Sequence, residues 1–335
     1  MIIQSAPGGP VERFLAQMNH EQKADGEVMN QEIKTLPSDS QNISKYRGAQ
    51  GVDAEIIAKI EKLYGFDLPM HQRFFLMVKK YLSFDFGESF YQDKKITDMI
   101  VERLPVSISP GLWSMLLVYG ISIPLGIKKA VNDGSKFDLI TSGIVIFLYA
   151  IPSFLFAILL VVFFCGGNFL NIFPLKGLVS HNFSELNWWQ KIADYFWHMA
   201  LPIITMTIGG FASLTFFVKN SFTEEIKKQY VLSAVAKGLD QKKILYRHIF
   251  RNAMLIIIAG LPASLLGMLF SSSMLIEIIF SLDGLGLMGY EAVLARDYPV
   301  VFSTLYIFTL LGLVANIITD VTYKIVDPRI NFNRV

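Results

Sequence analysis

Five long apolar runs dominate the pattern of hydrophobic and polar positions along the chain. They cover residues 105–127, 139–164, 199–218, 254–276 and 298–319, and none of them contains Asp, Glu, Lys or Arg. A helix crosses the hydrocarbon core of a bilayer in about 20 apolar residues, so each run is long enough to span it. An isolated strand would leave its backbone groups unpaired in lipid. The pattern therefore predicts an all-α, multi-pass membrane protein in which these runs are transmembrane helices.

The composition agrees with a membrane protein and excludes a soluble globular domain. Hydrophobic residues make up 53% of the chain and charged residues only 17%, and the mean hydropathy is +0.44. The single cysteine, Cys165, excludes a disulfide within the chain, so the fold depends on packing. Each run also contains a proline. Kinks are common in membrane bundles and are the favoured interpretation, and kinked helices around a moving pathway are the alternative.

The distribution of basic residues predicts the orientation of the helices. Fourteen Lys and Arg residues follow the first, third and fifth runs, whereas three lie in the opposite short loops. Basic residues are retained on the cytoplasmic side of a membrane, so the loops with fourteen are expected to be cytoplasmic. The predicted organisation is a membrane domain over 105–323, with a cytoplasmic loop at 219–253 and a cytoplasmic tail at 324–335.

This orientation places the N-terminal region outside. Export of residues 11–104 requires a preceding transmembrane helix. We therefore expect residues 1–10 to be the end of a truncated first transmembrane helix, and the natural protein to have six transmembrane helices. The alternative is a chain whose N-terminus is genuinely outside. Within the outer loop, apolar clusters predict short helices at 53–65, 74–82 and 96–104.

The cytoplasmic loop has the pattern of two basic amphipathic segments. Glu224 and Glu225 come before two lysines, which suits the start of a helix. An apolar stripe follows at helical spacing, and small residues after it allow close approach by another surface. Gly238 is expected to end the helix in the left-handed conformation. On this pattern alone, a basic loop that only sets the topology is the simpler interpretation. The stripe consists of Ile226, Tyr230, Val231 and Ala234.

The run YVLSAVAKGLDQKKILYRHIFRNA (230–253) resembles the docking signature of permeases of ATP-binding-cassette (ABC) importers, in the oligopeptide/dipeptide/nickel class. That motif begins Glu-Ala-Ala and has a glycine four positions after the second Ala. Here Leu232, Ser233 and Ala234 occupy the first three positions and Gly238 matches the glycine. The Glu and a later Leu-Pro are absent, departures that this class commonly shows. At the end of the run, His248, Arg251, Asn252 and Ala253 also match.

The resemblance extends over essentially the whole chain. SAPGGP resembles the end of the first helix of that class, YGFDLPMHQRFFLMVKKYLSFDFGESF its outer segment, GLGLMGYEAVLARDYPVV its last outer loop and VDPR its tail. Within the class, the chain is most similar to the B-type permeases of the Yej group, associated with uptake of oligopeptides and microcin C.

The resemblance implies that the chain forms one permease half of a type I importer in the bacterial inner membrane. The implied partners are a second, homologous permease, two ABC ATPase subunits or domains and a periplasmic peptide-binding protein. The chain itself is expected to be non-catalytic and to need no cofactor or metal, and it has no Gly-x4-Gly-Lys-Ser/Thr phosphate loop. The residues implied to dock the ATPase are Ser233, Ala234, Ala236, Lys237, Gly238 and Leu239.

Other functions remain possible interpretations of the sequence. Within the same class, the substrate could be nickel or another small ligand. A self-sufficient secondary carrier or channel is the other alternative, but carriers usually have ionisable residues within their spans, and the five runs have none. Glu277, Ser271 and Ser272 are candidates for lining the outer pathway. A structural role is favoured for Glu277, and helix packing for the serines.

Overall fold

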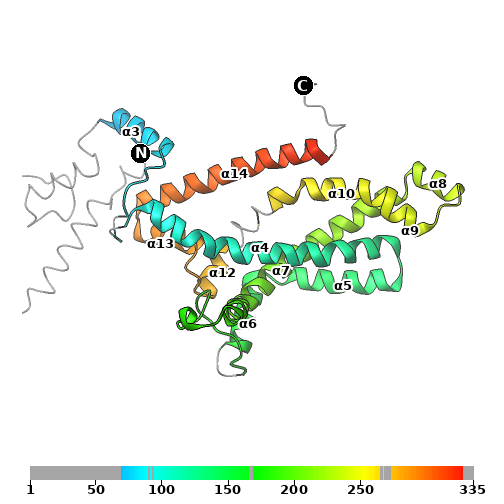
Figure 1. Ribbon diagram of the computed structural model, residues 1–335, viewed down its shortest axis with the longest axis horizontal. Helices are drawn as coiled ribbons and strands as arrows, with labels where there is room; N and C mark the ends of the chain where they lie inside the picture. Colours follow the sequence, from blue (N-terminus) through cyan, green and yellow to red (C-terminus); the bar gives the residue numbers. More distant parts are fainter. Residues whose placement is uncertain are drawn as a thin grey trace, which may run out of the picture. The chain divides into compact units, whose positions relative to one another are not determined.

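The computed structural model describes residues 69–89, 91–92, 94–165, 169–264, 267 and 273–326, and these residues are predominantly helical (Figure 1). The predicted end of a truncated helix at 1–10 and the short helix expected at 53–65 lie outside the described residues. The helices are α3 (Met70–Leu82), α4 (Ile96–Val131), α5 (Lys136–Ala150), α6 (Ser153–Phe164), η3 (Phe183–Glu185), α7 (Trp188–Ile226), α8 (Gln229–Ala236), α9 (Gln241–Ile244), η4 (Leu245–Ile249), α10 (Phe250–Ala259), α12 (Ser273–Ile279), α13 (Leu285–Ala295) and α14 (Tyr298–Val326).

The described residues belong to two compact units. Those up to Asp98, together with Ala292–Ser303, form the smaller unit, which contains α3. Those within Met99–Glu291, together with the residues from Thr304 onward, form the larger unit. The predicted cytoplasmic loop lies entirely in the larger unit.

Three of the described helices are long and apolar enough to cross a membrane, namely α4, α7 and α14. Helices α5 and α6 pass the same test together, but the chain bends by 86° between them. The bend is at Pro152, which precedes α6 and cannot donate a backbone hydrogen bond to α5. The middle of the fourth predicted span lies outside the described residues, and α10 and α12 cover only its ends.

Two helices extend beyond the predicted spans. The prediction of a separate short helix at 96–104 was wrong, because α4 continues as one helix through Pro105, Pro110 and Pro124. Prolines are tolerated within membrane helices because neighbouring groups satisfy the freed backbone atoms. Helix α7 likewise continues to Ile226, so the acidic pair before the two lysines ends a long helix and does not begin a new one. The short helix predicted at 74–82 is confirmed as part of α3.

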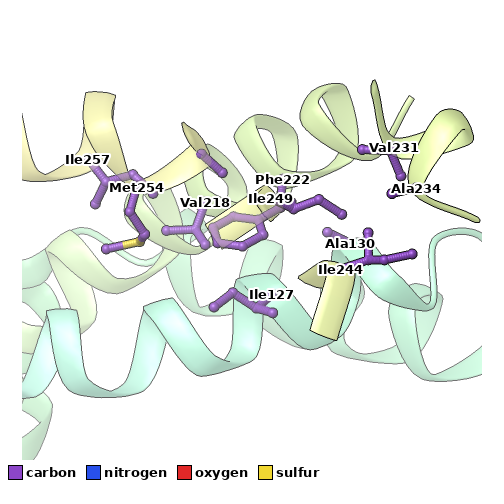
Figure 2. Close-up of a cluster of buried hydrophobic side chains, with 11 residues drawn as sticks. Ile127, Ala130, Val218, Phe222, Val231, Ala234, Ile244, Ile249, Met254 and Ile257 are labelled. Carbon is purple, nitrogen blue, oxygen red and sulfur yellow. The ribbon is translucent and has the colours of Figure 1, made fainter. Parts of the chain in front are cut away.

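A buried hydrophobic cluster holds the loop segments α8, α9 and η4 onto α4 and α7 (Figure 2). Phe222 of α7 is fully buried within it, and its ring meets that of Phe250 edge to face. Figure 1 shows α8 and α9 at the end of the larger unit where α4 turns into α5. The buried members of this loop cluster are Ile127, Ala130, Val218, Phe222, Val231, Ala234, Ile244, Ile249, Ala253, Met254 and Ile257.

Candidate functional site

Helix α8 is a separate short helix between two sharp changes of backbone direction. Lys228 has an extended backbone (φ −73°, ψ 148°), which separates α8 from the end of α7. At the other end, Gly238 has φ +74°, the left-handed conformation predicted from the sequence. The N–H of Gly238 donates to the carbonyl of Val235 (2.9 Å), and that of Leu239 donates to Ala234 (3.3 Å). This pair of hydrogen bonds is a Schellman motif, and it satisfies carbonyls that the helix end would otherwise leave unpaired.

One face of α8 is buried and the opposite face is exposed. Val231 and Ala234 insert into the loop cluster, as their helical spacing predicts (Figure 2). Leu232 and Val235, in contrast, are 65% and 55% exposed. Exposed aliphatic side chains next to each other on a helix indicate a surface that another protein can cover. The helix therefore presents a small apolar face away from the core that holds it.

The six residues predicted to dock an ATPase divide between these faces. Ser233, Ala236, Lys237 and Gly238 are exposed, Leu239 is half-buried, and Ala234 is buried in the loop cluster. Ala234 therefore holds α8 onto the core, and the four exposed residues are accessible at the surface of the described chain.

Three large exposed apolar side chains at this site, Leu232, Val235 and Tyr246, are not among the residues predicted from the sequence. Leu232 and Val235 are three residues apart on α8. Val235 is also one turn after the buried Val231, so helical spacing alone would have placed it on the packed side, and only the structure shows its exposure. Tyr246, which is also exposed, lies in the π-helical segment η4 on the returning limb. A single π-helical turn inside an α-helical segment is frequent at functional sites.

A polar cluster fixes the entry to α8. The carboxylate of Glu225 is buried and accepts the hydroxyl of Tyr230 at 2.8 Å, and it also pairs with Lys228 at 2.5 Å. The side chain of Asn252, from α10, bonds to both Glu225 and Tyr230. The carboxylate raises the pKa of Lys228, and burial raises the pKa of the Tyr230 hydroxyl. These contacts tie the first turn of α8 to α7 and α10.

The returning limb is also fixed to the bundle. The side chain of Asp240 caps α9 by accepting the N–H of Lys242 at 3.1 Å. The hydroxyl of Ser221 in α7 donates to the carbonyl of Ala253 in α10 at 2.9 Å. Both limbs of the loop are therefore anchored to α7 and α10.

Glu277, a candidate for the outer pathway, is buried in a network of hydrogen bonds. Its side chain is 2% exposed and accepts the hydroxyl of Ser107 and the N–H of Leu287. A Cβ at Gly284 would lie 2.3 Å from the Glu277 carboxyl carbon, so the glycine is needed for the carboxylate to fit. The other two pathway candidates, Ser271 and Ser272, lie outside the described residues.

Comparison with known protein families shows which family the chain belongs to. The family described as "Binding-protein-dependent transport system inner membrane component" matches residues 122–332, more than half of the 335 residues. The chain belongs to this family. Its matched part contains α8, both anchored limbs of the loop and Glu277, whereas Ser107, which donates to Glu277, precedes the matched part.

Individual relatives agree with the family assignment. The "Peptidoglycan transport system permease protein YejB" of Agrobacterium fabrum (strain C58 / ATCC 33970) is 54% identical over 341 residues, covering 100% of this chain and 93% of the relative. The "Inner membrane ABC transporter permease protein YejB" of Escherichia coli O157:H7 is 53% identical over 336 residues, covering 99% and 92%. The "Oligopeptide transport system permease protein OppB" of Haemophilus influenzae is 30% identical, covering 86% and 90%.

A solved structure confirms the fold class. The permease fold of the MetNI methionine ABC transporter in an inward-facing conformation matches with a TM-score of 0.54 and 17% identity, covering 69% of this chain and 97% of that chain. The protein is therefore a multi-pass inner-membrane permease component with the type I importer fold, as the sequence predicted.

Proposed function

We propose that this chain forms half of the translocation pathway of an ATP-driven importer for oligopeptides. The observation that supports this proposal is the geometry of α8. The helix is anchored on one face and at both ends, and it presents Leu232, Val235 and the small residues Ser233 and Ala236 on the other. An anchored helix with an exposed apolar face suits a surface that receives a displacement from a partner and passes it to the membrane helices.

The proposed complex contains four kinds of component. This permease pairs with a second, homologous permease, and each docks one ABC ATPase subunit or domain. A periplasmic binding protein delivers the substrate at the outer face. ATP binding and hydrolysis belong to the ATPases, and the permease contributes no catalytic residue and no cofactor. The exposed residues Ser233, Ala236, Lys237 and Gly238 contact the ATPase, whereas Ala234 and Leu239 support them from behind.

The proposed substrates are peptides. The names of the relatives specify oligopeptide, dipeptide and peptidoglycan transport. Peptidoglycan itself carries short peptide chains. Microcin C-like peptides fall within the same chemical class. Nickel or another small ligand is the alternative within this family of systems, and uptake by purified components distinguishes the two.

The test is reconstitution of the purified permease pair, ATPases and binding protein in proteoliposomes. We expect ATP-dependent uptake of a radiolabelled oligopeptide and none of ⁶³Ni²⁺. Uptake of neither, or uptake of peptide without ATP, would overturn the proposal.

Docking through α8 is tested separately by co-purification. Leu232→Asp places a charge on the exposed face and is expected to release the ATPase from the detergent-solubilised complex. Leu82→Asp is the matched control, since Leu82 is equally exposed, at 70%, but lies in α3 of the predicted outer loop. Full retention of the ATPase by Leu232→Asp would contradict docking at this face.

A further inference from the structure

A buried ionic network joins the turn between α4 and α5 to α7. Lys129, in the last turns of α4, has no exposed side-chain surface. Its ammonium group lies 3.0 Å from a carboxylate oxygen of Asp138 and donates to the carbonyl of the same residue at 3.0 Å. It also donates to the hydroxyls of Thr141 (2.9 Å) and Ser142 (2.7 Å). All of these acceptors are in the first two turns of α5.

The second oxygen of the Asp138 carboxylate faces α7. The ammonium of Lys219 lies 2.7 Å from it and 2.9 Å from a carboxylate oxygen of Asp133, in the turn before α5. The N–H of Gly134 also donates to Asp138 at 3.2 Å. Two positive and two negative charges are thus connected, and Asp138 is the residue that bridges the two lysines.

Stability alone does not account for this network. Removing charged groups from water costs several kcal/mol for each ion, and well-packed apolar residues often replace a buried ion pair without loss of stability. Ion pairs differ from apolar contacts in requiring one particular geometry between their elements. The network therefore fixes the position of α7 relative to the α4–α5 turn more strictly than packing would.

The network lies directly beside the loop cluster that carries α8. Lys219 is three residues before Phe222 and next to Val218, and both are buried in the cluster. On α4, Lys129 is flanked by Ala130 and is two residues after Ile127, which belong to the same cluster. The helix that leads into α8 is therefore held to the α4–α5 turn by the network on one side and by apolar contacts on the other.

We propose that Lys129, Asp138 and Lys219 are positioning residues for energy coupling. They lock the ends of α4, α5 and α7 into one body, so that displacement of α8 by its docked partner moves all three helices. This inference rests on the proposed function, since it assumes that α8 is the surface that is displaced. Without the network, α8 would follow its partner while the α4–α5 turn lagged behind.

The test compares transport with ATP hydrolysis in the same proteoliposomes. Lys219→Met removes the bridge to α7 and is expected to lower the number of peptides taken up per ATP hydrolysed by about tenfold, within the range of measured coupling between sites. ATPase retention and the hydrolysis rate should stay close to those of the wild type. Lys219→Arg keeps the positive charge and should retain most of the wild-type ratio of peptide uptake to ATP hydrolysis. Lys136→Met is the matched control, because Lys136 is an exposed lysine at the start of α5, close to the network in sequence but not one of its members.

A wild-type ratio of uptake to hydrolysis in Lys219→Met would overturn this inference while leaving the proposed function intact. Absence of ATP-dependent uptake by the wild-type complex would instead overturn the proposed function. A purely structural role predicts that uptake and hydrolysis fall together as complex is lost, with an unchanged ratio, and that result would also overturn the inference.

A distance measurement covers the case in which Lys219→Met does not assemble. Spin labels at positions 136 and 243, both exposed and outside the proposed docking residues, report the separation of the start of α5 from α9, which directly follows α8, once Cys165→Ser has removed the native thiol. In the otherwise wild-type complex, we expect the same distance distribution in the nucleotide-free state and after trapping with ATP and vanadate. A shift of this distribution on trapping would overturn the inference, because the two segments would then not move as one body.

Discussion

The hydroxyl of Ser107 in α4 donates to the carboxylate of Glu277 in α12 at 2.7 Å, and both side chains are buried. The same hydroxyl oxygen accepts the N–H of Leu285 at 2.8 Å, and the other carboxylate oxygen accepts the N–H of Leu287. Arg103, one turn earlier in α4, pairs with Asp283 at 2.7 Å. These contacts hold the turn before α13 to α4. They agree with the structural role that the sequence favoured for Glu277, and they identify its partners, which the sequence did not.

The first prediction concerns removal of this carboxylate. Glu277→Ala leaves the Ser107 hydroxyl and the N–H of Leu287 buried without their acceptor, at a cost of about 1–3 kcal/mol for each lost partner. We expect a clearly lower unfolding temperature in detergent, measured by intrinsic fluorescence or differential scanning.

Glu291→Ala is the control, because Glu291 is exposed on the neighbouring helix α13 and should change the unfolding temperature little. If Glu277 lined the pathway instead, Glu277→Ala would change the KM for peptide uptake while the unfolding temperature stayed at the wild-type value. That combination would contradict the structural role.

The second prediction concerns Gly284, which the network requires for steric reasons. A Cβ at this position would lie 2.3 Å from the carboxyl carbon of Glu277, closer than van der Waals contact allows. Gly284→Ala should therefore destabilise the protein by about 1–3 kcal/mol, as overpacked sites do. In a double-mutant cycle with Glu277→Ala the two effects should be less than additive, since the second change removes the clashing group.

Gly143→Ala serves as the control for the glycine substitution. Gly143 lies inside α5, and a Cβ there would meet no atom within 4 Å. Alanine is favoured over glycine in a helix, so this variant should be neutral or slightly more stable. Strict additivity of Gly284→Ala and Glu277→Ala would show that the glycine is not there to accommodate the carboxylate.

Sequence reasoning could predict the elements of this fold because they depend on local patterns. Long uncharged apolar runs define α4, α7 and α14, and a glycine after a helical stripe predicts the left-handed end of α8. The resemblance of residues 230–253 to a docking signature located the candidate site, which lies within the residues that the family matches. These features are visible in a single stretch of chain.

Contacts between distant segments could not be predicted in this way. Ser107 and Glu277 are 170 positions apart, and Lys219 and Asp138 are 81 apart, so no local spacing indicates that they meet. The continuous helix through Pro105 was also missed, since whether a proline interrupts a membrane helix depends on its neighbours in the bundle. The separation of α8 into supporting and exposed residues likewise required knowing which face packs on the core.

The third prediction concerns the buried support of α8. Phe222 is fully buried in the loop cluster, so Phe222→Ala should cost about 3–5 kcal/mol through lost contacts and the resulting cavity. The measurement is thermal unfolding of the purified permease, together with protease sensitivity of the loop. Phe217→Ala, on the same helix but 44% exposed, is the control and should have a much smaller effect. Equal losses for the two variants would mean that the cluster does not support the loop.

The last prediction concerns the end of α8, where Gly238 has φ +74° and a Cβ would meet no atom within 4 Å. Because space is available, a side chain at this position is opposed only by the left-handed backbone, which costs about 1–2 kcal/mol for most residues and less for Asn or Asp. Gly238→Asp should therefore insert normally into the membrane.

Even so, Gly238→Asp should abolish ATP-coupled uptake, because it places a negative charge at the edge of the proposed docking face. Gly238→Asn is the matched control. It has the same size and a similar tolerance of the left-handed conformation, but it carries no charge, so we expect it to retain much of the uptake and to co-purify with the ATPase. Equal loss of uptake in the two variants would point to the backbone of the turn and not to the charge. Wild-type uptake in Gly238→Asp would place the docking surface elsewhere on the chain.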